Sequence, residues 1–436
     1  MIDYLIYFAQ AYPEFRRAEL ESLAQLYDIP LDILHHDPST PFLIVQLRND
    51  EDAKKLIDRA VLSRGIYELW GMGETLEELH TSVRSMSGHR FEEKKHNLFR
   101  FDFEGYMGTR TREQKNAIIE SFAYLGFQGK VRLKNPDQIY TVLELYRTNG
   151  QTKAETPLKI WFGRQVQLSA RSNGVLDKYD LRRRKYIGTT SFDAELCLAS
   201  CNIAQVNHDK IVYDPFAGTG SFMVTAANFG GLAIGSDIDV RMLKGKGDRD
   251  VASNFRQYGT SLHFLDTMTM DFTNNALRQD FPIDTIVCDP PYGVREGLRV
   301  CGARDPAKAA GREDVIIDGE KAHLRRDFIP PKKPYELSDL LGDLLDFAAR
   351  RLPIGGRLAF WMPTANDEFQ PHHVPQHESL QLLYNLEQEF NKWSRRLLVY
   401  VRMNESYEGK TINGLKENVH FRDRYFSKFN EKSKEV

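Results

Sequence analysis

The sequence predicts an α/β protein in which a doubly wound, mainly parallel sheet follows a smaller α+β region. Two observations predict this architecture. From about residue 189 onward, short apolar runs alternate with helical segments, as in sheets whose strands are joined by crossover helices. The region before residue 171 opens instead with the order strand, helix, strand, helix. A polar stretch at 171–188 lies between the two regions, and we interpret it as a linker.

The first region divides into two predicted domains. Residues 1–95 show the element order of a ferredoxin-like α+β unit. Residues 96–170 begin with Phe99–Glu104, where apolar and polar residues alternate as in a half-buried strand. The elements expected in this region are, in order, a strand at 3–9, a helix opened by Pro13, a strand at 42–47, a helix at 50–63, a strand at 99–104, a helix at 112–125, and strands at 139–146 and 159–168.

The third and largest predicted domain covers residues 189–436. Its apolar runs are expected to form the strands of the parallel sheet, at 211–213, 232–236, 262–265, 285–288, 357–362 and 397–401. The segment 294–335 interrupts this alternation with many charges and few apolar runs. We expect a long functional loop or a partly disordered insertion there.

Composition limits the possible functions only broadly. Of the 436 residues, 41% are hydrophobic and 28% are charged, and the formal net charge is −2, so a surface that binds nucleic acid must be a local basic patch. The four cysteines form no C-x-x-C pair, which fits a reducing compartment, and we expect no bound metal. Neither a signal peptide nor a membrane-spanning run is evident, so we expect a cytoplasmic protein.

The strongest motif follows the first strand of the third domain. It is Asp214-Pro215-Phe216-Ala217-Gly218-Thr219-Gly220, and it leads from a strand into a helix. Glycines at such a turn let the backbone approach a ligand, but the spacing is not the G-x-G-x-x-G of dinucleotide sites. An acidic residue before the glycines suits a cationic ligand, such as S-adenosylmethionine with its ammonium and sulfonium groups.

Two further acids are expected at the carboxyl ends of the next two strands. Asp237, followed by Ile238, can accept hydrogen bonds from ribose hydroxyls, and Asp266, followed by Thr267, can accept one from an adenine amino group. Each acid alone could simply be a polar strand end. Acids at three successive strand ends favour a ligand site, because ligands bind outside the carboxyl ends of such strands.

The fourth strand ends in the motif Asp289-Pro290-Pro291-Tyr292, which suits methyl transfer to a planar amine. The lone pair of such an amine is delocalised into the ring, so the amine is a poor nucleophile. If the Asp289 carboxylate and the Pro290 carbonyl accept its hydrogens, the lone pair can localise, and Asp289 can stabilise the developing charge. Pro291 stiffens the loop, and Tyr292 offers a ring on which a flipped base can stack.

These two motifs together resemble the class of methyltransferases that act on amino groups of DNA adenine, RNA bases or protein glutamine. The class implies a Rossmann-like class I methyltransferase fold with a seven-stranded, mainly parallel sheet. Arg110–Lys115 through Lys134–Gln138 resembles a THUMP domain, an RNA-binding module of tRNA-modifying enzymes. Most of the chain, from the N-terminal α+β unit to roughly residue 405, is similar to the eukaryotic catalytic subunit of the tRNA guanine-N2 methyltransferases that modify the guanosine at position ten.

The resemblance also implies a partner, a small zinc-binding activator protein shared among several methyltransferases. In the usual strand order of these folds, the third strand lies at one edge of the sheet, and an apolar edge needs a cover. We therefore expect the activator to add a strand beside residues 262–265 and to bury Leu262 and Phe264. The alternative is that helices of the chain itself bury these side chains.

Two basic clusters are candidates for tRNA backbone contacts. The first is in the THUMP-like segment and the second in the linker, and they consist of Lys130, Arg132 and Lys134, and of Arg182, Arg183, Arg184 and Lys185. Either cluster could equally be a solvated charged surface. Two other functions also stay open, namely an adenine-N6 methyltransferase with the same catalytic motif and a non-catalytic RNA-binding scaffold.

Overall fold

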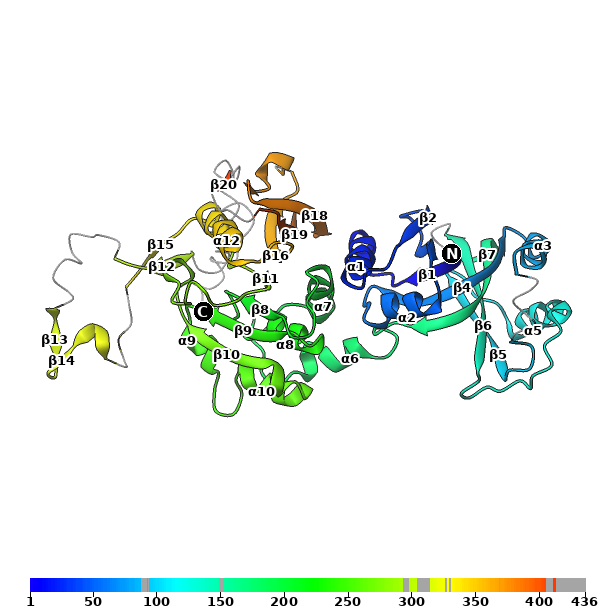
Figure 1. Cartoon of the computed structure of the whole chain (residues 1–436), viewed down its shortest axis with the longest axis horizontal. Coiled ribbons are helices and arrows are strands. Elements are labelled where there is room, and N and C mark those ends of the chain that lie inside the picture. Colours follow the sequence, from blue (N-terminus) through cyan, green and yellow to red (C-terminus); the bar gives the residue numbers. More distant parts are fainter. Residues whose placement is uncertain are drawn as a thin grey trace, which may run out of the picture. The chain divides into compact units, whose positions relative to one another are not determined.

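The computed structural model describes residues 1–87, 92, 94–148, 153–292, 298–303, 314–325, 328, 331–367, 369–404 and 411–412. The chain forms two compact units, Met1–Leu176 and Asp177–Val436 (Figure 1). Over the described residues, no helix has both the length and the apolar character needed to cross a membrane.

The first unit is built on one seven-stranded sheet with the order β2-β3-β1-β4-β7-β6-β5. Its elements are β1 (Ile2–Phe8), α1 (Pro13–Leu26), β2 (Asp32–His36), β3 (Phe42–Leu47), α2 (Asp50–Asp58), β4 (Ser63–Gly73), α3 (Leu76–Ser87), β5 (Phe99–Tyr106), α5 (Arg112–Ser121), β6 (Gln138–Thr148) and β7 (Lys153–Leu168). All the strands predicted in this region are present, whereas β2, β4 and α3 were not predicted.

Strand β4 joins the two regions that we expected as separate domains. The helix expected at 50–63 ends at Asp58, and β4 begins at Ser63. This strand pairs antiparallel with β1 on one side and with β7 on the other. The expected boundary between residues 95 and 96 therefore falls inside a single continuous sheet, because the long-range pairing of β4 connects both halves.

The second unit contains a nine-stranded sheet with the order β10-β9-β8-β11-β16-β19-β18-β17-β20. Strands β10, β9, β8, β11 and β16 are parallel, β19 pairs antiparallel with β16, and β18 pairs antiparallel with β19. The strands of the sheet are β8 (Ile211–Asp214), β9 (Leu232–Asp237), β10 (Phe264–Thr269), β11 (Thr285–Cys288), β16 (Arg357–Ala365), β17 (Gln376–His377), β18 (Leu380–Glu389), β19 (Trp393–Arg402) and β20 (Thr411–Ile412). The sheet expected for the class is extended by the two-residue strands β17 and β20.

Helices flank both faces of this sheet (Figure 1). They are α7 (Ala194–Ile203), α8 (Ser221–Asn228), α9 (Val240–Lys244), α10 (Val251–Tyr258) and α12 (Leu337–Arg351). Leucines of α12 pack with Tyr213, Ile286 and Phe360 in one core cluster. Side chains alternate along a strand, so Trp361 points to the opposite face, where its Nε1 donates to Ser200 of α7 at 3.2 Å. The parallel strands β8, β9, β11 and β16 are therefore buried on both faces, as a doubly wound sheet requires, whereas the edge strand β10 is more exposed.

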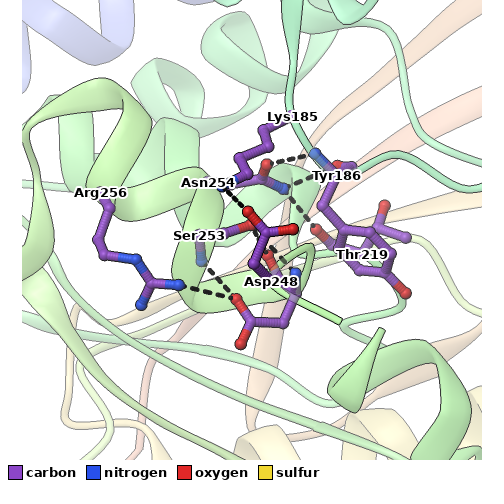
Figure 2. A network of polar contacts seen from close by, with 8 residues as sticks. Lys185, Tyr186, Thr219, Asp248, Ser253, Asn254 and Arg256 are labelled. Carbon is purple, nitrogen blue, oxygen red and sulfur yellow. Dashed lines mark hydrogen bonds and ion pairs between the residues drawn. The ribbon is translucent and has the colours of Figure 1, made fainter. Parts of the chain in front are cut away.

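The predicted linker is largely part of the second unit. The short helix α6 (Val175–Tyr179) spans the boundary, and the buried ring of Tyr179 stacks on Tyr258 of α10 with centroids 4.3 Å apart. Asn254 of α10 exchanges two hydrogen bonds with the backbone of Tyr186, at 2.9 and 2.8 Å, and donates to the Thr219 carbonyl at 3.4 Å (Figure 2). Segment 177–188 is thereby fixed to the turn that follows β8.

Candidate active site

The turn between β8 and α8 depends on its glycines. Gly218 and Gly220 have φ values of 51° and 81°, in the left-handed region that favours glycine. A Cβ on Gly220 would also lie 2.8 Å from Val251. Asp214, which is 2% exposed, accepts a hydrogen bond from the Phe216 amide at 3.0 Å. The turn thus exposes backbone to a ligand while a buried carboxyl group holds its first residues.

Asp237 connects the end of β9 to the same turn. One of its carboxylate oxygens accepts from the Gly218 amide at 2.9 Å, and the other accepts from the Asp239 amide at 2.8 Å. Burial raises the pKa of Asp237 and raises the pKa of Asp214 well above its usual value, with each backbone hydrogen bond acting in the opposite direction. Both acids therefore lie where a cationic or hydroxyl-bearing ligand would relieve their desolvation.

The acid at the end of the third strand is Asp271, and the expectation for Asp266 and Thr267 was wrong. Strand β10 begins only at Phe264, so Asp266 lies within it, opposite Ile234 of β9, and is exposed. Its carboxylate accepts from the amide of Thr267 at 2.7 Å, and neither residue lines the cavity described below. The carboxyl end of the strand is Thr269, so the next residues, Met270 and Asp271, reach the ligand side of the sheet.

Asp271 is 8% exposed and accepts several hydrogen bonds. The donors are the Thr273 amide and hydroxyl, both at 3.0 Å, the Asn274 side chain at 3.1 Å and the Cys301 amide at 2.6 Å. Burial acts to raise the pKa of Asp271, but these donors outweigh it and the pKa is lowered. Asp271 is therefore held ionised, as a strong acceptor should be.

The proposed catalytic motif follows β11, which lies between β8 and β16 in the sheet. Pro290 is buried, Pro291 is exposed, and Asp289 and Tyr292 are partly buried. The Tyr292 hydroxyl donates to Asp289. Burial raises the pKa of Asp289 to about 6, while the Tyr292 hydrogen bond and the charge of Arg395 act to lower it. Asp289 is thus mostly ionised at neutral pH, but its proton affinity is higher than that of an ordinary aspartate.

A cavity of about 890 Å³ brings these strand ends together. Its walls include nearly all the predicted cofactor and catalytic residues, which are Asp214, Pro215, Phe216, Ala217, Gly218, Asp237, Ile238, Asp289, Pro290, Pro291 and Tyr292. Gly220 is not part of the wall; it shapes the turn and precedes α8. Further acids in the wall are Asp193, Asp239 and Asp271. The excess of carboxylates gives the cavity a negative potential that favours a cationic ligand.

Sequence reasoning missed several residues of this wall. Phe192 precedes α7, Trp393 and Arg395 belong to β19, and Leu298 and Tyr335 flank the ribbon formed by β12 (Arg299–Cys301) and β15 (Lys332–Pro334). The described part of the insertion at 294–335 therefore contributes to the cavity. The only sequence signal for Asp271 was the continued alternation of residues after Leu265, and no local pattern indicated Arg395.

The basic candidates differ in their exposure. Lys130, Arg132 and Lys134 are all exposed, on a segment joined to β5 by a bridge between Val131 and Phe99. The expectation for Arg184 was wrong, since it is 4% exposed and donates to Ser221 at 2.9 Å and to Tyr258 at 3.2 Å. It is buried because segment 177–188 packs onto α8 and α10.

The other three linker cations are accessible. Arg182 is paired with Asp180 at 2.7 Å, and Arg183 is exposed and donates to the Asp177 carbonyl at 3.4 Å. Lys185 is paired with Asp248 at 2.7 Å (Figure 2). Surface pairs of this kind contribute little to stability, so these side chains can exchange partners for a phosphate.

Comparison with known proteins agrees with this architecture. Residues 2–171 match the Tmrp11 THUMP N-terminal domain, and residues 182–300 match the RMKL-like methyltransferase domain. The chain is 54% identical to the tRNA (guanine(10)-N(2))-methyltransferase of Saccharomyces cerevisiae, covering 99% of this chain and 100% of the relative. It is 32% identical to the tRNA (guanine(10)-N(2))-methyltransferase TRMT11 of Homo sapiens, covering 97% and 95%.

Among solved structures, TrmN from Thermus thermophilus matches at 17% identity with a TM-score of 0.41, over 92% of this chain and 100% of that chain. The full-length identity to the curated relatives decides the family. This chain belongs to the tRNA (guanine(10)-N(2))-methyltransferase family.

Proposed function

We propose that this chain transfers a methyl group from S-adenosylmethionine to the exocyclic N2 amine of the guanosine at position ten of tRNA. The names of its full-length relatives support the substrate. The observation that supports the chemistry is the position of Asp289, at a strand end in the wall of an acid-rich cavity. An adenine-N6 activity or a non-catalytic scaffold has no comparable support.

The residues of the cavity fit S-adenosylmethionine, which supplies a methyl group activated on a sulfonium when it is bound. Asp214 and the turn at 215–220 would face its amino acid part, and Asp237 would accept from its ribose hydroxyls. Asp271 takes the role that we expected of Asp266, as the acceptor for the adenine amino group. Each assignment places an acceptor opposite a donor of the ligand, and of these acceptors Asp214 and Asp271 are buried and Asp237 is partly buried.

At the catalytic end, the Asp289 carboxylate and the Pro290 carbonyl would accept the two hydrogens of the guanine amine. This arrangement localises the nitrogen lone pair toward the methyl donor and stabilises the positive charge that develops on the nitrogen. Asp289 then removes one amine proton after the new C–N bond has formed. Tyr292 holds the Asp289 carboxylate in place through its hydrogen bond and offers a ring for stacking.

The assay is methylation of a tRNA transcript with guanosine at position ten, followed by mass spectrometry of its nucleosides. Incorporation of N2-methylguanosine by the wild type, and its loss in Asp289→Ala with cofactor and tRNA binding retained, is the expected result. N6-methyladenosine as the product, or an Asp289→Ala variant with more than about a tenth of the turnover, would contradict the proposal.

For tRNA binding, we propose that Lys130, Arg132 and Lys134 contact phosphates. The three side chains are exposed on one short segment, so they can reach the same stretch of RNA backbone. Replacing all three by Gln should weaken tRNA binding and lower the dependence of the affinity on salt. Unchanged salt dependence would contradict this assignment.

We also propose the small zinc-binding activator protein as a partner at the edge strand β10. Its support is that β10 is the outermost strand of its sheet and that Leu262 and Leu265 are 93% and 42% exposed. The earlier expectation needs one change, because Phe264 packs against Phe255 of α10 at 4.7 Å. Leu262 and Leu265, rather than Phe264, are therefore the side chains that a partner would cover.

Co-expression with the activator is the test of this interface. Leu262→Asp combined with Leu265→Asp should prevent co-purification, whereas Leu34→Asp, at an exposed leucine of the first unit, should not. Equal recovery of the complex with both variants would contradict the proposal. The expected cytoplasmic location also remains a prediction, which imaging of a tagged chain would test.

A further inference from the structure

Arg395, in the wall of the cavity, forms no ion pair with another described residue. Arg395 lies on β19 and donates from Nε and Nη2 to the same oxygen of Gln388, at 3.1 and 2.7 Å. Gln388 is neutral, although carboxylates surround the cavity. The charge of Arg395 thus remains available to something that enters the cavity.

Aromatic rings hold this guanidinium in place. Its central carbon lies 4.4 Å from the ring centroid of Phe192, and 5.5 and 5.4 Å from those of Trp361 and Phe390. Stacking on rings and the double hydrogen bond to Gln388 fix the plane of the group. Of its donors, Nη1 makes no hydrogen bond to any described residue. A guanidinium that is held in one plane and has an unused N–H donor is suited to a planar acceptor.

Arg395 lines the same cavity as Asp289 and lies on β19, which is separated in the sheet only by β16 from β11, the strand that Asp289 follows. Its charge acts to lower the pKa of Asp289 and that of Tyr292, which burial raises. The other arginine in the described wall, Arg299, belongs to the ribbon of the insertion. Arg395 is therefore the cation best placed to meet the base that presents its amine to Asp289.

We propose that Arg395 donates a hydrogen bond to the O6 atom of the target guanine and thereby selects guanine over adenine. This inference rests on the proposed function. The catalytic motif alone does not distinguish the two bases, since either can present an amine to Asp289. When the 2-amine of guanine and the 6-amine of adenine are superposed with their N1 atoms, the O6 of guanine coincides with the C2–H of adenine. A donor at that point gains a partner only in guanine, and arginine is the common donor to this oxygen.

The test compares two substrates and three variants. The substrates are tRNA with guanosine and tRNA with 2-aminopurine at position ten, since 2-aminopurine keeps the 2-amine and lacks O6. Arg395→Met keeps the apolar stem over Phe192 but removes the donors, and Arg395→Lys keeps the charge without the planar fork. Arg396→Met is the matched control, because Arg396 pairs with Glu387 at 2.7 Å and is not part of the cavity wall.

The wild type and the control should prefer guanosine in kcat/KM by about ten- to hundredfold, the usual effect of one hydrogen bond to a charged group. Arg395→Met should lose most of this preference, and Arg395→Lys should recover turnover on guanosine with a smaller preference than the wild type. Dividing the wild-type preference for guanosine by the preference of each variant removes effects of 2-aminopurine that do not involve Arg395.

An Arg395→Met variant that is slower on both substrates by the same factor would overturn the inference, because packing or a phosphate contact would then account for the residue. A wild type that does not discriminate between the substrates would overturn it as well. Failure of the wild type to methylate guanosine at position ten would instead overturn the proposed function, so the two failures are distinguishable.

Discussion

The rate of methyl transfer should depend on the protonation of Asp289. Burial raises the pKa of this carboxyl group from its ordinary value of 3.8 to about 6, and only the ionised form can accept an amine hydrogen and later the proton. As the pH falls through the raised pKa, the carboxylate gains a proton and this role is lost. The rate should therefore begin to fall at a pH well above the pKa of an exposed aspartate.

The magnitude follows from the position of that pKa. With a value near 6, about nine-tenths of Asp289 is ionised at pH 7 and about one-tenth at pH 5. We therefore expect kcat/KM, which reports groups of the free enzyme, to fall roughly tenfold between these two pH values. Arg395→Met should move the acid limb to higher pH, because the arginine charge acts to lower this pKa.

The assay measures the initial rate of methylation of the tRNA transcript between about pH 4.5 and 8, a range that brackets the raised pKa of Asp289. Asp214 and Asp237 also have raised pKa values, so cofactor affinity must be measured by calorimetry at each pH and the cofactor kept saturating. A flat profile down to pH 5 with the cofactor saturating would refute the role given to Asp289.

Three further predictions concern stability and cofactor binding. Asp289→Asn should raise the free energy of unfolding of the ligand-free protein at pH 7 by at most about 3 kcal/mol, measured by denaturant unfolding. The reason is that the folded state disfavours the ionised Asp289 carboxylate. This stabilisation should disappear at a pH below the pKa that Asp289 has in the unfolded chain. Asp271→Ala should weaken S-adenosylmethionine binding roughly tenfold or more in calorimetry, whereas Asp266→Ala should leave it unchanged; equal losses would contradict the reassignment. Arg184→Met should lower the free energy of unfolding by about 1.5–3 kcal/mol, because it removes two buried hydrogen bonds. Arg182→Met, at an exposed residue, should lie within about 0.5 kcal/mol of the wild type. A larger loss for Arg182→Met than for Arg184→Met would contradict the structural role given to Arg184.

The short motifs and most of the local elements were evident from the sequence. The run from Asp214 to Gly220 needs glycines where φ is positive, so its composition alone indicates a turn between a strand and a helix. Strand β3 was predicted with its observed limits, 42–47, β1 within one residue at each end, and α1 with its observed start at Pro13. Such features depend on residues that are close in the chain, so local patterns are sufficient to predict them.

Features that depend on distant pairing were decided only by the tertiary structure. The register of β10 against β9 makes Asp271, rather than Asp266, the acid at the strand end, and β4 turns two expected domains into one sheet by pairing with β1 and β7. Arg184 had the same local context as its exposed neighbours, and its burial follows from packing on α8 and α10. Arg395 reaches the catalytic motif because β19 lies beside β16, which itself pairs with β11. Neither the neighbours of a strand nor the burial of a charge is encoded within a short window of sequence, because both depend on which distant segments come together in the fold.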